Sequence, residues 1–564
     1  MKKVSDRALA AAVALGLSAL FWALRCRTFG PGDSAQHVAA GLTWGVSRPP
    51  GYPLYDALAW AWTRLPWPNP AGAVDGLSGL FAAAAAAVFF LLLRRQRCGR
   101  AAALTATGLM ALSPLFWYYS EVAEVRALND LLALAAAYSL FDWLERGGAR
   151  RAALFGAAFG LGVSHHPTFA LLAPAFAWLA WPRRKAASKS ADVAALAAAV
   201  ALAAPYLALW LRLSLAPPPA YNPDGVRTAA DVLALFLRRN TGGYFNMFGR
   251  ARSPLAEFRF ADFARHGGWM LSGLGRGLGA AGLAAAAAGA AALWRREREK
   301  LVFWELWAVV PAGVFLLISS QQMPPLDPDY IRAVCLRFYL LPMIGLFALA
   351  AFGLDWLLAR SRPALAWTLV AVAWLGPALG RPVDLRGRDW TKAYAEEIVR
   401  ASGPRDFVML AADDSIMGTA YLDVVEHATG DRVFLMPWLF GYPAYIENLA
   451  RRHPGLTIPR DSAGAVSPRL RDWLAVNPGR GLCAETVDYG PLRREFPHLN
   501  ARGPLVVVSG ADATRAERAR QAESFFRGPL AAARDDEAYA DTQELYVFKA
   551  ARRAAVLHGQ VSRP

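Results

Sequence analysis

Long apolar segments recur along the chain from residue 8 to residue 380, and short polar segments separate them. A membrane-spanning helix needs about 20 apolar residues, or somewhat fewer in a thin bilayer. By this measure the pattern predicts about 11 spans. They cover residues 8–24, 74–93, 101–117, 127–144, 152–164, 166–181, 191–213, 269–293, 301–319, 338–358 and 364–380. We therefore predict a polytopic α-helical membrane protein.

The last part of the chain, residues 381–564, reads instead like a soluble domain, with strand-like runs between amphipathic stretches. The expected strands are 407–411, 432–436, 504–509 and 545–549, and the expected helices are 416–429, 441–453, 467–475 and 514–525. We predict a transmembrane domain over residues 1–380 and a C-terminal soluble α/β domain over residues 381–564. The latter contains no glycine-rich nucleotide-binding motif.

Lysine and arginine cluster between alternate apolar runs, as they do in cytoplasmic loops of membrane proteins. This alternation places the N-terminus in the cytoplasm and the C-terminal domain outside it. The loops on the outer side are then 25–73, 214–268 and 320–337. The net charge of +17 reflects these topology signals, so we predict a lipid bilayer as partner and no nucleic acid.

The composition narrows the class further. With 55% hydrophobic and 19% charged residues, the chain is too apolar for a disordered protein or an ordinary soluble enzyme. Its four cysteines are scattered and form no metal-binding or disulfide pattern. The N-terminal apolar run lacks a small-residue cleavage site, so we predict an uncleaved first helix.

The first candidate site is segment 32–37, GDSAQH, directly after the first span. A carboxylate held at the outer mouth, Asp33, can take a proton from an acceptor hydroxyl or bind a metal. The spacing of Asp33 and Gln36 is also that of a helix N-cap with a capping box. His37 closes the segment and is a candidate substrate-binding residue.

The second candidate is segment 47–54, SRPPGYPL, in which two prolines and a glycine fix a sharp turn. Such a turn can present Arg48 to a phosphate. It can equally be a hairpin in which Arg48 and Tyr52 only contact neighbouring segments. The local sequence leaves both interpretations open.

The third candidate is segment 121–130, EVAEVRALND, at the outer start of a span. Glu121 and Glu124 share one helix face. So many polar residues at a membrane boundary, Asn129 among them, are costly unless they line a wet cavity. The alternative is an interfacial salt-bridge cluster with Arg126.

The fourth candidate is the pair His165 and His166, at a break in the apolar stretch 152–181. The break favours two short spans, because a single long one would put neighbouring basic clusters on opposite sides of the membrane. A lone histidine is usually structural. A histidine pair can bind a divalent metal if Asp33 or Glu124 completes the ligand set.

The fifth candidate is the pair Arg332 and Arg337, which lie outside against the usual charge bias and can grip an anionic phosphate near the bilayer. All five candidates fall on the same predicted side of the membrane. This convergence indicates one polar site at the outer membrane face, built from loops and helix ends.

These motifs resemble a bacterial family related to the transmembrane protein O-mannosyltransferases of the GT-C superfamily. The resemblance covers most of residues 30–180 in order. The matching residues are Asp33-Ser34, PPGYPL at 49–54, AEV at 123–125, ALN at 127–129 and His165-His166, and the segments 412–415 and 421–422 look like the family's outer domain.

The resemblance implies a GT-C fold that transfers a sugar from a polyprenyl-phosphate-linked donor to an acceptor outside the cytoplasm, in a bacterial inner membrane. The acceptor can be a protein, a lipid or a glycan. Asp33 would act as the base and Arg332 or Arg337 would hold the donor phosphate. Glu124, Asn129 and His165 would orient sugar or acceptor. We predict no cofactor, with a divalent metal as the open alternative.

Three positions depart from the family pattern: Gln36 replaces its glutamate, Arg48 its histidine and Arg126 its tyrosine. Gln36 cannot serve as a second carboxylate. Two other functions therefore stay open, a lipid-linked saccharide transporter (flippase) and a non-catalytic envelope scaffold. A transporter would need charged residues along the inner half of its spans, and the sequence shows few.

Overall fold

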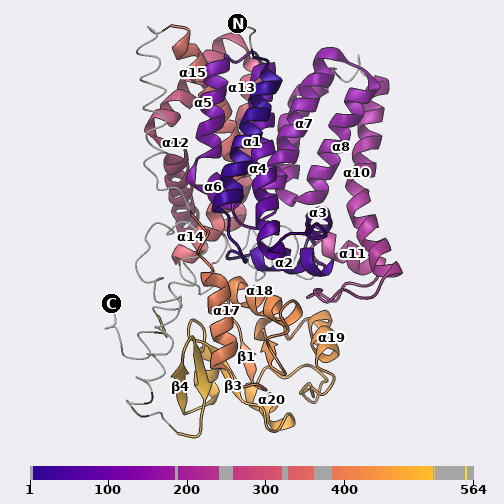
Figure 1. Cartoon of the computed structure of the whole chain (residues 1–564), viewed down its shortest axis with the longest axis vertical. Helices are drawn as coiled ribbons and strands as arrows, with labels where there is room; N and C mark the ends of the chain where they lie inside the picture. The colour runs from indigo at the N-terminus through magenta and orange to yellow at the C-terminus, as the bar shows by residue number, and fades with distance from the viewer. Residues whose placement is uncertain are drawn as a thin grey trace.

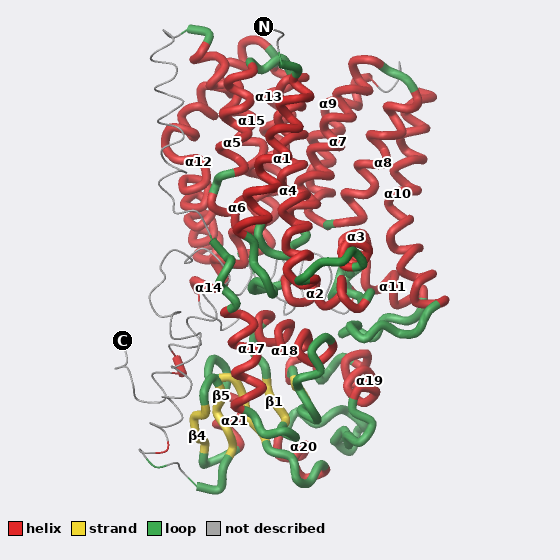
Figure 2. The backbone as a smooth tube through the Cα atoms, viewed as in Figure 1, coloured by secondary structure: helices red, strands yellow, loops and turns green. Residues whose placement is uncertain are grey.

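The computed structural model describes residues 4–183, 188–239, 258–320, 328–360 and 384–511, together with residues 514, 517, 553 and 554. A bundle of helices forms one end of the molecule and a smaller α/β domain forms the other (Figure 1). The β-strands are confined to the α/β domain (Figure 2).

The bundle consists of long helices joined by short connections. Their bounds are α1 Asp6–Leu24, α4 Pro70–Arg95, α5 Arg100–Ala111, α6 Pro114–Ser120, α7 Arg126–Arg146, α8 Ala149–His165, α9 Ala173–Ala180, α10 Ser188–Leu215, α12 Phe260–Arg296, α13 Arg298–Ser319 and α15 Leu340–Leu358. Shorter elements lie at the end near the α/β domain or interrupt the long helices. They are α2 Ser34–Thr43, α3 Pro53–Thr63, α11 Ala229–Phe236, α14 Pro328–Leu336 and the 3₁₀ helices η1 Pro167–Leu172, η2 Trp181–Arg183 and η4 Arg337–Tyr339.

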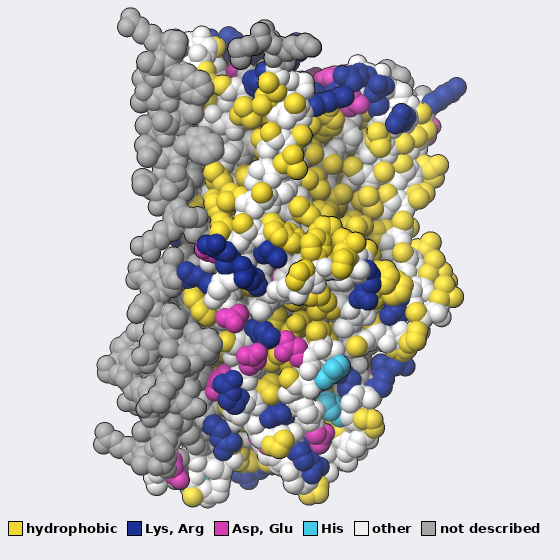
Figure 3. All heavy atoms as spheres, in the orientation of Figure 1, with side chains coloured by type: hydrophobic (Ala, Val, Ile, Leu, Met, Phe, Trp, Pro, Cys, Tyr) yellow, Lys and Arg dark blue, Asp and Glu magenta, His cyan; other side chains and the backbone are white. Residues whose placement is uncertain are grey.

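Six of the described helices are long and apolar enough to cross a membrane, and the pair α5–α6, bent by 66°, makes a possible seventh span. Figure 3 shows a broad band of hydrophobic side chains on the bundle, with Lys and Arg gathered at the end far from the α/β domain. The prediction of a multi-pass membrane protein is confirmed. The count of eleven is not: α7 carries charged residues and α8 has only 17 residues, and segment 364–380 lies outside the described residues.

Small residues let pairs of these helices approach closely. A Cβ atom on Gly289 of α12 would lie 1.9 Å from the carbonyl oxygen of Leu349, and one on Gly353 of α15 would lie 1.8 Å from that of Ala285. The helices α8 and α10 meet in the same way, at Gly156. In a bilayer the surrounding lipid is as apolar as the helices, so the hydrophobic effect does not drive helices together. Their association depends instead on close van der Waals packing of this kind.

The predicted break near residue 165 is present. Helix α8 ends at His165, His166 has an extended conformation, and η1 starts at Pro167. Proline has no backbone N–H and excludes the helical conformation for the residue before it, which explains why the helix ends here.

Helices α2 and α3 lie between the bundle and the α/β domain (Figure 1). Their side chains join one buried cluster with residues of the bundle and of α18. In the loop before α2, the Phe29 ring also packs on Tyr421 of α18, with ring centroids 4.8 Å apart. The backbone N–H of Gly32 donates to Asp414 Oδ1 at 2.8 Å. The segment that follows the first span is thus held from both sides.

The α/β domain contains a five-stranded sheet in the order β2-β1-β3-β5-β4. Strands β1, β2 and β3 are parallel, and β5 is antiparallel to both β3 and β4. The bounds are β1 Phe407–Met409, β2 Val433–Leu435, β3 Leu482–Glu485, β4 Leu499–Arg502, β5 Leu505–Val508, α17 Trp390–Ala401, α18 Asp413–Val424, η5 Pro437–Leu439, α19 Pro443–Arg452, α20 Leu470–Val476 and α21 Gly490–Glu495.

Three of the predicted strands contain β1, β2 and β5, whereas β3 and β4 were not predicted and segment 545–549 lies outside the described residues. The predicted domain boundary also lies outside them. Strand β3 reads Leu-Cys-Ala-Glu and is fully buried, so it lacks the alternating pattern that marks a half-exposed strand.

The carboxyl end of β1 faces the bundle. The loop that follows it is fixed by Glu485, the last residue of the neighbouring strand β3. One carboxylate oxygen of Glu485 accepts hydrogen bonds from the N–H of Ala411 at 2.5 Å and from Ser415 Oγ at 2.7 Å, and the other accepts one from Tyr394 at 2.8 Å. In open α/β sheets, ligands bind beyond the carboxyl ends of strands where neighbouring connections diverge.

Candidate active site at the seam between bundle and α/β domain

An arginine held by two carboxylates lies where the bundle meets α2. Arg337 Nη1 donates to Asp33 Oδ2 at 3.0 Å and to Glu124 Oε1 at 3.1 Å. The exposed fractions of the three side chains are 10% for Arg337, 19% for Asp33 and 1% for Glu124. Three buried charges are costly to desolvate, so their retention at one point marks a candidate functional site.

Each member comes from a different element. Asp33 directly precedes α2, Glu124 lies in the connection between α6 and α7, and Arg337 begins η4 at the entrance to α15. Glu124 is fixed by Ser78 of α4, whose hydroxyl accepts from the Glu124 N–H at 3.1 Å. The sequence predicted each of these residues as a candidate, and the structure brings all three together.

Asp33 has both carboxylate oxygens occupied. Gln36 Nε2 donates to Oδ1 at 3.0 Å, while Oδ2 accepts from Arg337. Burial favours the neutral acid, but attraction to Arg337, and then to His37, keeps the pKa of Asp33 below its ordinary value. The carboxylate is therefore ionised at neutral pH. Asp33 occupies the N-cap position of α2, as its spacing to Gln36 predicted, but its carboxylate makes no side-chain cap hydrogen bond to the helix.

Gln36 connects this cluster to a second ion pair. Its Oε1 accepts from the backbone N–H of Arg48 at 3.1 Å, and the Arg48 guanidinium lies 3.6 Å from Asp413 Oδ1, at the start of α18. The Asp413 side chain is 48% exposed, in contrast to the buried cluster around Arg337. The α/β domain thus contributes a carboxylate next to the site.

A second arginine lies beside the first. Arg126 is buried, its Nε lies 3.9 Å from Glu124 Oε2, and its guanidinium stacks over the Phe338 ring at 4.2 Å. The Arg337 guanidinium lies 5.4 Å from the same ring. Two arginines side by side are balanced here by two carboxylates, an arrangement that an incoming phosphate could share.

Several buried polar atoms around these charges have no hydrogen-bond partner in the part of the chain that the structure describes. They are His37 Nε2, Tyr119 Oη, Asn129 Oδ1, Ser164 Oγ and His165 Nδ1. Buried polar groups are normally satisfied, so a group of unsatisfied ones indicates space for a polar ligand. Both donors and acceptors are present, as recognition of sugar hydroxyls requires.

Aromatic and imidazole rings lie beside these atoms. The Tyr52 ring stacks on His166 at 5.8 Å and meets His37 edge-on at 5.4 Å, while Tyr55 stacks on His165 at 6.5 Å. His165 Nε2 lies 2.9 Å from the carbonyl oxygen of Val125, so Nε2 carries the proton. The sharp turn around Tyr52 therefore packs against the histidine pair.

His37 is held by a carboxylate that the sequence did not reveal. Its Nδ1 lies 3.3 Å from Asp56 Oδ1 on α3, and Asp56 Oδ2 accepts from the backbone N–H of Ser47 at 3.1 Å. Burial opposes the charged imidazole, but the hydrogen bond to Asp56 and the attraction to Asp56, Glu124 and Asp33 together outweigh it and raise the pKa of His37. Burial also raises the pKa of Asp56.

The shift of His37 predicts how stability depends on pH near neutrality. Because the folded-state pKa of His37 lies above that of the unfolded chain, its protonation stabilises the fold below about pH 6.5, and this contribution is lost as the pH rises through the folded-state pKa. The raised pKa of Asp56 acts in the same direction at lower pH, since its contribution starts to be lost above about pH 4. We expect the thermal midpoint in detergent to fall between pH 6.5 and 8.5, and His37→Asn to flatten this slope. His427→Asn, at an exposed histidine, should keep the wild-type slope; an equal slope in His37→Asn would contradict the assignment.

Two predicted residues lie apart from the cluster. The Oε1 of Glu121 accepts from Trp117 Nε1 at 2.6 Å, and burial raises the pKa of Glu121 to about 9, so it is neutral at pH 7. Arg332 lies on α14, one turn before Arg337, and only Arg337 has a described ion pair with Asp33 and Glu124.

The described residues include no group of three or more His, Cys, Asp or Glu side chains placed to hold a metal ion. The open alternative of a divalent metal gains no support from them. Asp33 and Glu124 instead share a cation supplied by the protein itself, Arg337.

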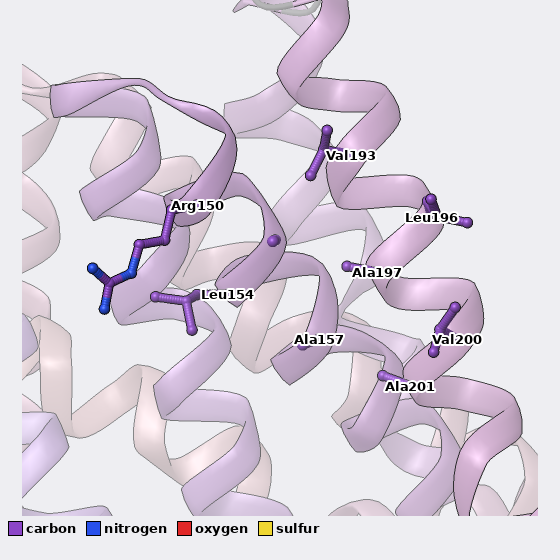
Figure 4. Close-up of a pocket in the computed structure, with 9 residues that line it drawn as sticks. Arg150, Leu154, Ala157, Val193, Leu196, Ala197, Val200 and Ala201 are labelled. Carbon is purple, nitrogen blue, oxygen red and sulfur yellow. The ribbon is translucent and has the colours of Figure 1, made fainter.

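A groove of about 490 Å³ between α8 and α10 is lined by aliphatic side chains and Arg150 (Figure 4). Leu154, Leu196 and Val200 in this groove are largely exposed. These side chains face the region that the hydrophobic band assigns to lipid, and they offer no chemistry.

Sequence reasoning missed Asp56, Asp413 and Phe338. Asp413 carried a signal, because it lies in the segment that resembles the family's outer domain. Asp56 and Phe338 carried none, since their partners lie far from them in the sequence.

Comparison with known proteins relates part of this chain to a described family. The family described as the N-terminal domain of the protein O-mannosyl-transferase TMEM260 matches residues 33–190. The match begins at Asp33 and includes Glu124 and the histidine pair. The mouse protein O-mannosyl-transferase TMEM260 is 35% identical over 121 residues. The chain is related to the transmembrane O-mannosyltransferases.

The extent of this similarity is limited. The aligned part is 21% of this chain and 17% of the mouse protein, so the chain spans less than a fifth of that relative. The family match covers the segment from α2 to α10, which carries Asp33, Gln36, Arg48, Glu124 and His165. Arg337 and the α/β domain lie beyond it.

Solved structures extend the likeness to nearly the whole fold. ArnT from Cupriavidus metallidurans bound to undecaprenyl phosphate has a TM-score of 0.51 and 13% identity, and the match covers 90% of this chain and 98% of that one. The apo state of ArnT from the same organism has a TM-score of 0.50 and 14% identity, and the match covers 89% of this chain and 97% of that one. This O-mannosyltransferase relative therefore has a GT-C fold.

Proposed function

We propose that this protein is a membrane glycosyltransferase that moves a sugar, mannose by family similarity, from a polyprenyl-phosphate donor to a hydroxyl of an extracytoplasmic acceptor. The observation that carries the proposal is the Asp33–Arg337–Glu124 cluster, in which Asp33 and Glu124 lie within the family match and Arg337 beyond it, beside unsatisfied polar atoms. The proposed location is a bacterial inner membrane, with the α/β domain outside the cytoplasm.

Asp33 is the proposed base. It would accept the proton of the acceptor hydroxyl while the acceptor oxygen attacks the anomeric carbon and the bond from that carbon to the phosphate oxygen breaks. The electron pair leaves with polyprenyl phosphate. Attack from the face opposite the leaving group inverts the anomeric configuration.

Arg337 would stabilise the leaving phosphate, with Arg126 beside it. As the structure stands, Arg337 occupies Asp33 Oδ2 and weakens it as a base. A donor phosphate that attracts Arg337 would free this oxygen for the acceptor. Donor binding would thereby activate the base.

The unsatisfied atoms of Asn129 and His165, with the ring of Tyr52, would bind the sugar. A hexose presents hydroxyls that both donate and accept, and apolar ring faces that pack on aromatic side chains. Glu124 would keep Arg337 in place when Asp33 changes its protonation state.

The transporter alternative finds less support. It requires charged groups available along the inner half of the bundle, whereas the charged side chains described there pair with each other. Asp6 pairs with Arg94 and Arg100, and Asp142 pairs with Arg95 and Arg151. A non-catalytic scaffold gives no reason to retain this charge cluster, because desolvation of its charges opposes folding.

The test is a transfer assay with the full chain in proteoliposomes. Polyprenyl phosphates carrying different labelled sugars are offered with envelope extracts as acceptors. Labelled acceptor identifies the sugar and supports the transferase. Passage of the intact donor across the bilayer without label on any acceptor would instead support the transporter.

The family glutamate at position 36 provides a further prediction. Gln36→Glu would place a negative charge about 3 Å from Asp33 Oδ1 in place of a donated hydrogen bond. We expect lower thermal stability and an acid limb of the pH–rate profile shifted to higher pH. Gln36→Met, which removes the hydrogen bond without adding charge, should leave the limb in place. A shift common to both variants would contradict this reasoning.

A further inference from the structure

A second cavity lies between the bundle side of the molecule and the α/β domain. Its volume is about 150 Å³, and Arg48 and Tyr221 line it on one side while residues of β2, α18 and α19 line it on the other. A cavity of this size holds a benzene ring in other proteins. It therefore fits one side chain the size of leucine or phenylalanine.

The cavity is predominantly apolar. Ile416, Met417, Phe434, Met436 and Leu439 form much of its wall. Binding an apolar group against such walls removes apolar surface from water, which favours binding.

Most polar groups in the wall are already paired, and Asp224 Oδ2 is an exception among the described atoms. Tyr445 accepts from the N–H of Met436 and donates to the carbonyl of Phe434, and Asn448 Nδ2 donates to the carbonyl of Pro223 at 2.7 Å. Arg452 pairs with Asp423. A glycan would need free hydrogen-bonding groups here, and these residues offer few.

Arg48 connects the cavity to the proposed base. Its guanidinium lines the cavity and pairs with Asp413, while its backbone N–H is bound by Gln36, which in turn donates to Asp33. One bridging residue, Gln36, separates Arg48 from Asp33. Arg48 therefore belongs both to the cavity wall and to the chain of contacts that ends at the base.

From this arrangement we propose that the cavity is an acceptor subsite for a polypeptide, binding an apolar side chain close in sequence to the serine or threonine whose hydroxyl reaches Asp33. The inference rests on the proposed transferase function and adds an apolar specificity subsite for its acceptor. The α/β domain then selects the acceptor, while the bundle binds the donor.

The test uses the full chain in proteoliposomes with mannosyl polyprenyl phosphate. The acceptors are short peptides with a single threonine flanked by leucine, phenylalanine or glycine, and a mannose oligosaccharide. Since one apolar pocket discriminates by about 10- to 200-fold, kcat/KM for the leucine or phenylalanine peptides should exceed that for the glycine peptide at least about tenfold.

Ala420 lines the cavity from α18. Ala420→Phe should fill it and abolish the preference, with unchanged binding of polyprenyl phosphate. Ala475→Phe, the same change at an exposed site on α20, should retain the preference. If Ala420→Phe fails to fold, Leu439→Ala tests the opposite change: a larger cavity should shift the preference toward tryptophan.

The outcomes separate the two proposals. Equal use of all peptides, a preference unchanged in Ala420→Phe, or transfer to the oligosaccharide alone would overturn the subsite and leave the transferase in place. Absence of both donor cleavage and transfer would contradict the proposed function itself.

Discussion

Asp33→Asn should abolish sugar transfer, by about 10²-fold or more, while the protein still folds and inserts. An amide cannot accept the proton of the acceptor hydroxyl, but it keeps the size of the carboxylate, and its single oxygen can still accept a hydrogen bond from Gln36 or from Arg337. Transfer rate, thermal midpoint and binding of polyprenyl phosphate should be measured on the same preparation.

A matched control separates loss of the base from loss of negative charge. Asp389 is exposed on the α/β domain and makes no side-chain cap hydrogen bond to α17, so Asp389→Asn should transfer at the wild-type rate. Full activity in Asp33→Asn would remove Asp33 as the base. Loss of donor binding along with transfer would assign it to the donor site instead.

Replacement of Arg337 should have the largest effect on stability. Arg337→Gln leaves Asp33 and Glu124 close together without their shared cation, and breaking a buried ion pair from one side costs about 3 to 5 kcal/mol. We expect a lower thermal midpoint and loss of polyprenyl phosphate binding. Arg360→Gln, at an exposed arginine that stacks on Trp356, is the matched control.

A double variant distinguishes the two effects of Arg337. Adding Glu124→Gln to Arg337→Gln removes one of the uncompensated charges, so part of the lost stability should return while donor binding stays absent. If donor binding returned as well, Arg337 would only hold the fold together. If Arg337→Gln were as stable as wild type, the ion pairs of Arg337 would not contribute to the stability of the fold.

Much of the fold could be predicted from hydropathy, because each membrane-spanning helix requires a continuous apolar segment of about 20 residues. Ten of the eleven predicted segments lie on described helices. The number of spans could not be settled in the same way, because α7 begins with Arg126, Asn129 and Asp130. These polar residues face the site, and hydropathy cannot distinguish a wet cavity from a loop.

The candidate site was predicted from motifs that lie in local stretches of sequence. Asp33, Glu124 and Arg337 were each singled out as polar groups at the predicted outer face, and the structure joins them. Their pairing was not predictable, since Arg337 lies 304 residues beyond Asp33. Asp413 and Asp56 also depend on tertiary contacts. Asp56 has no local pattern that separates it from an ordinary surface aspartate, and Asp413 was marked only by the resemblance of its segment to the family's outer domain.

The replacement of the family glutamate by Gln36 now has a structural explanation. Its amide donates to Asp33 and accepts from Arg48 at once, which a charged carboxylate cannot do. Nearby, Asp413 supplies a carboxylate from the α/β domain to Arg48.

The most direct test of the central proposal is the amount of polyprenyl phosphate released by the wild-type chain in proteoliposomes, measured together with the sugar that appears on the acceptor. A transferase that uses the Asp33–Arg337–Glu124 cluster should release one polyprenyl phosphate for each sugar transferred, over many turnovers. Recovery of the intact donor on the other side of the bilayer, with no sugar on any acceptor, would contradict it.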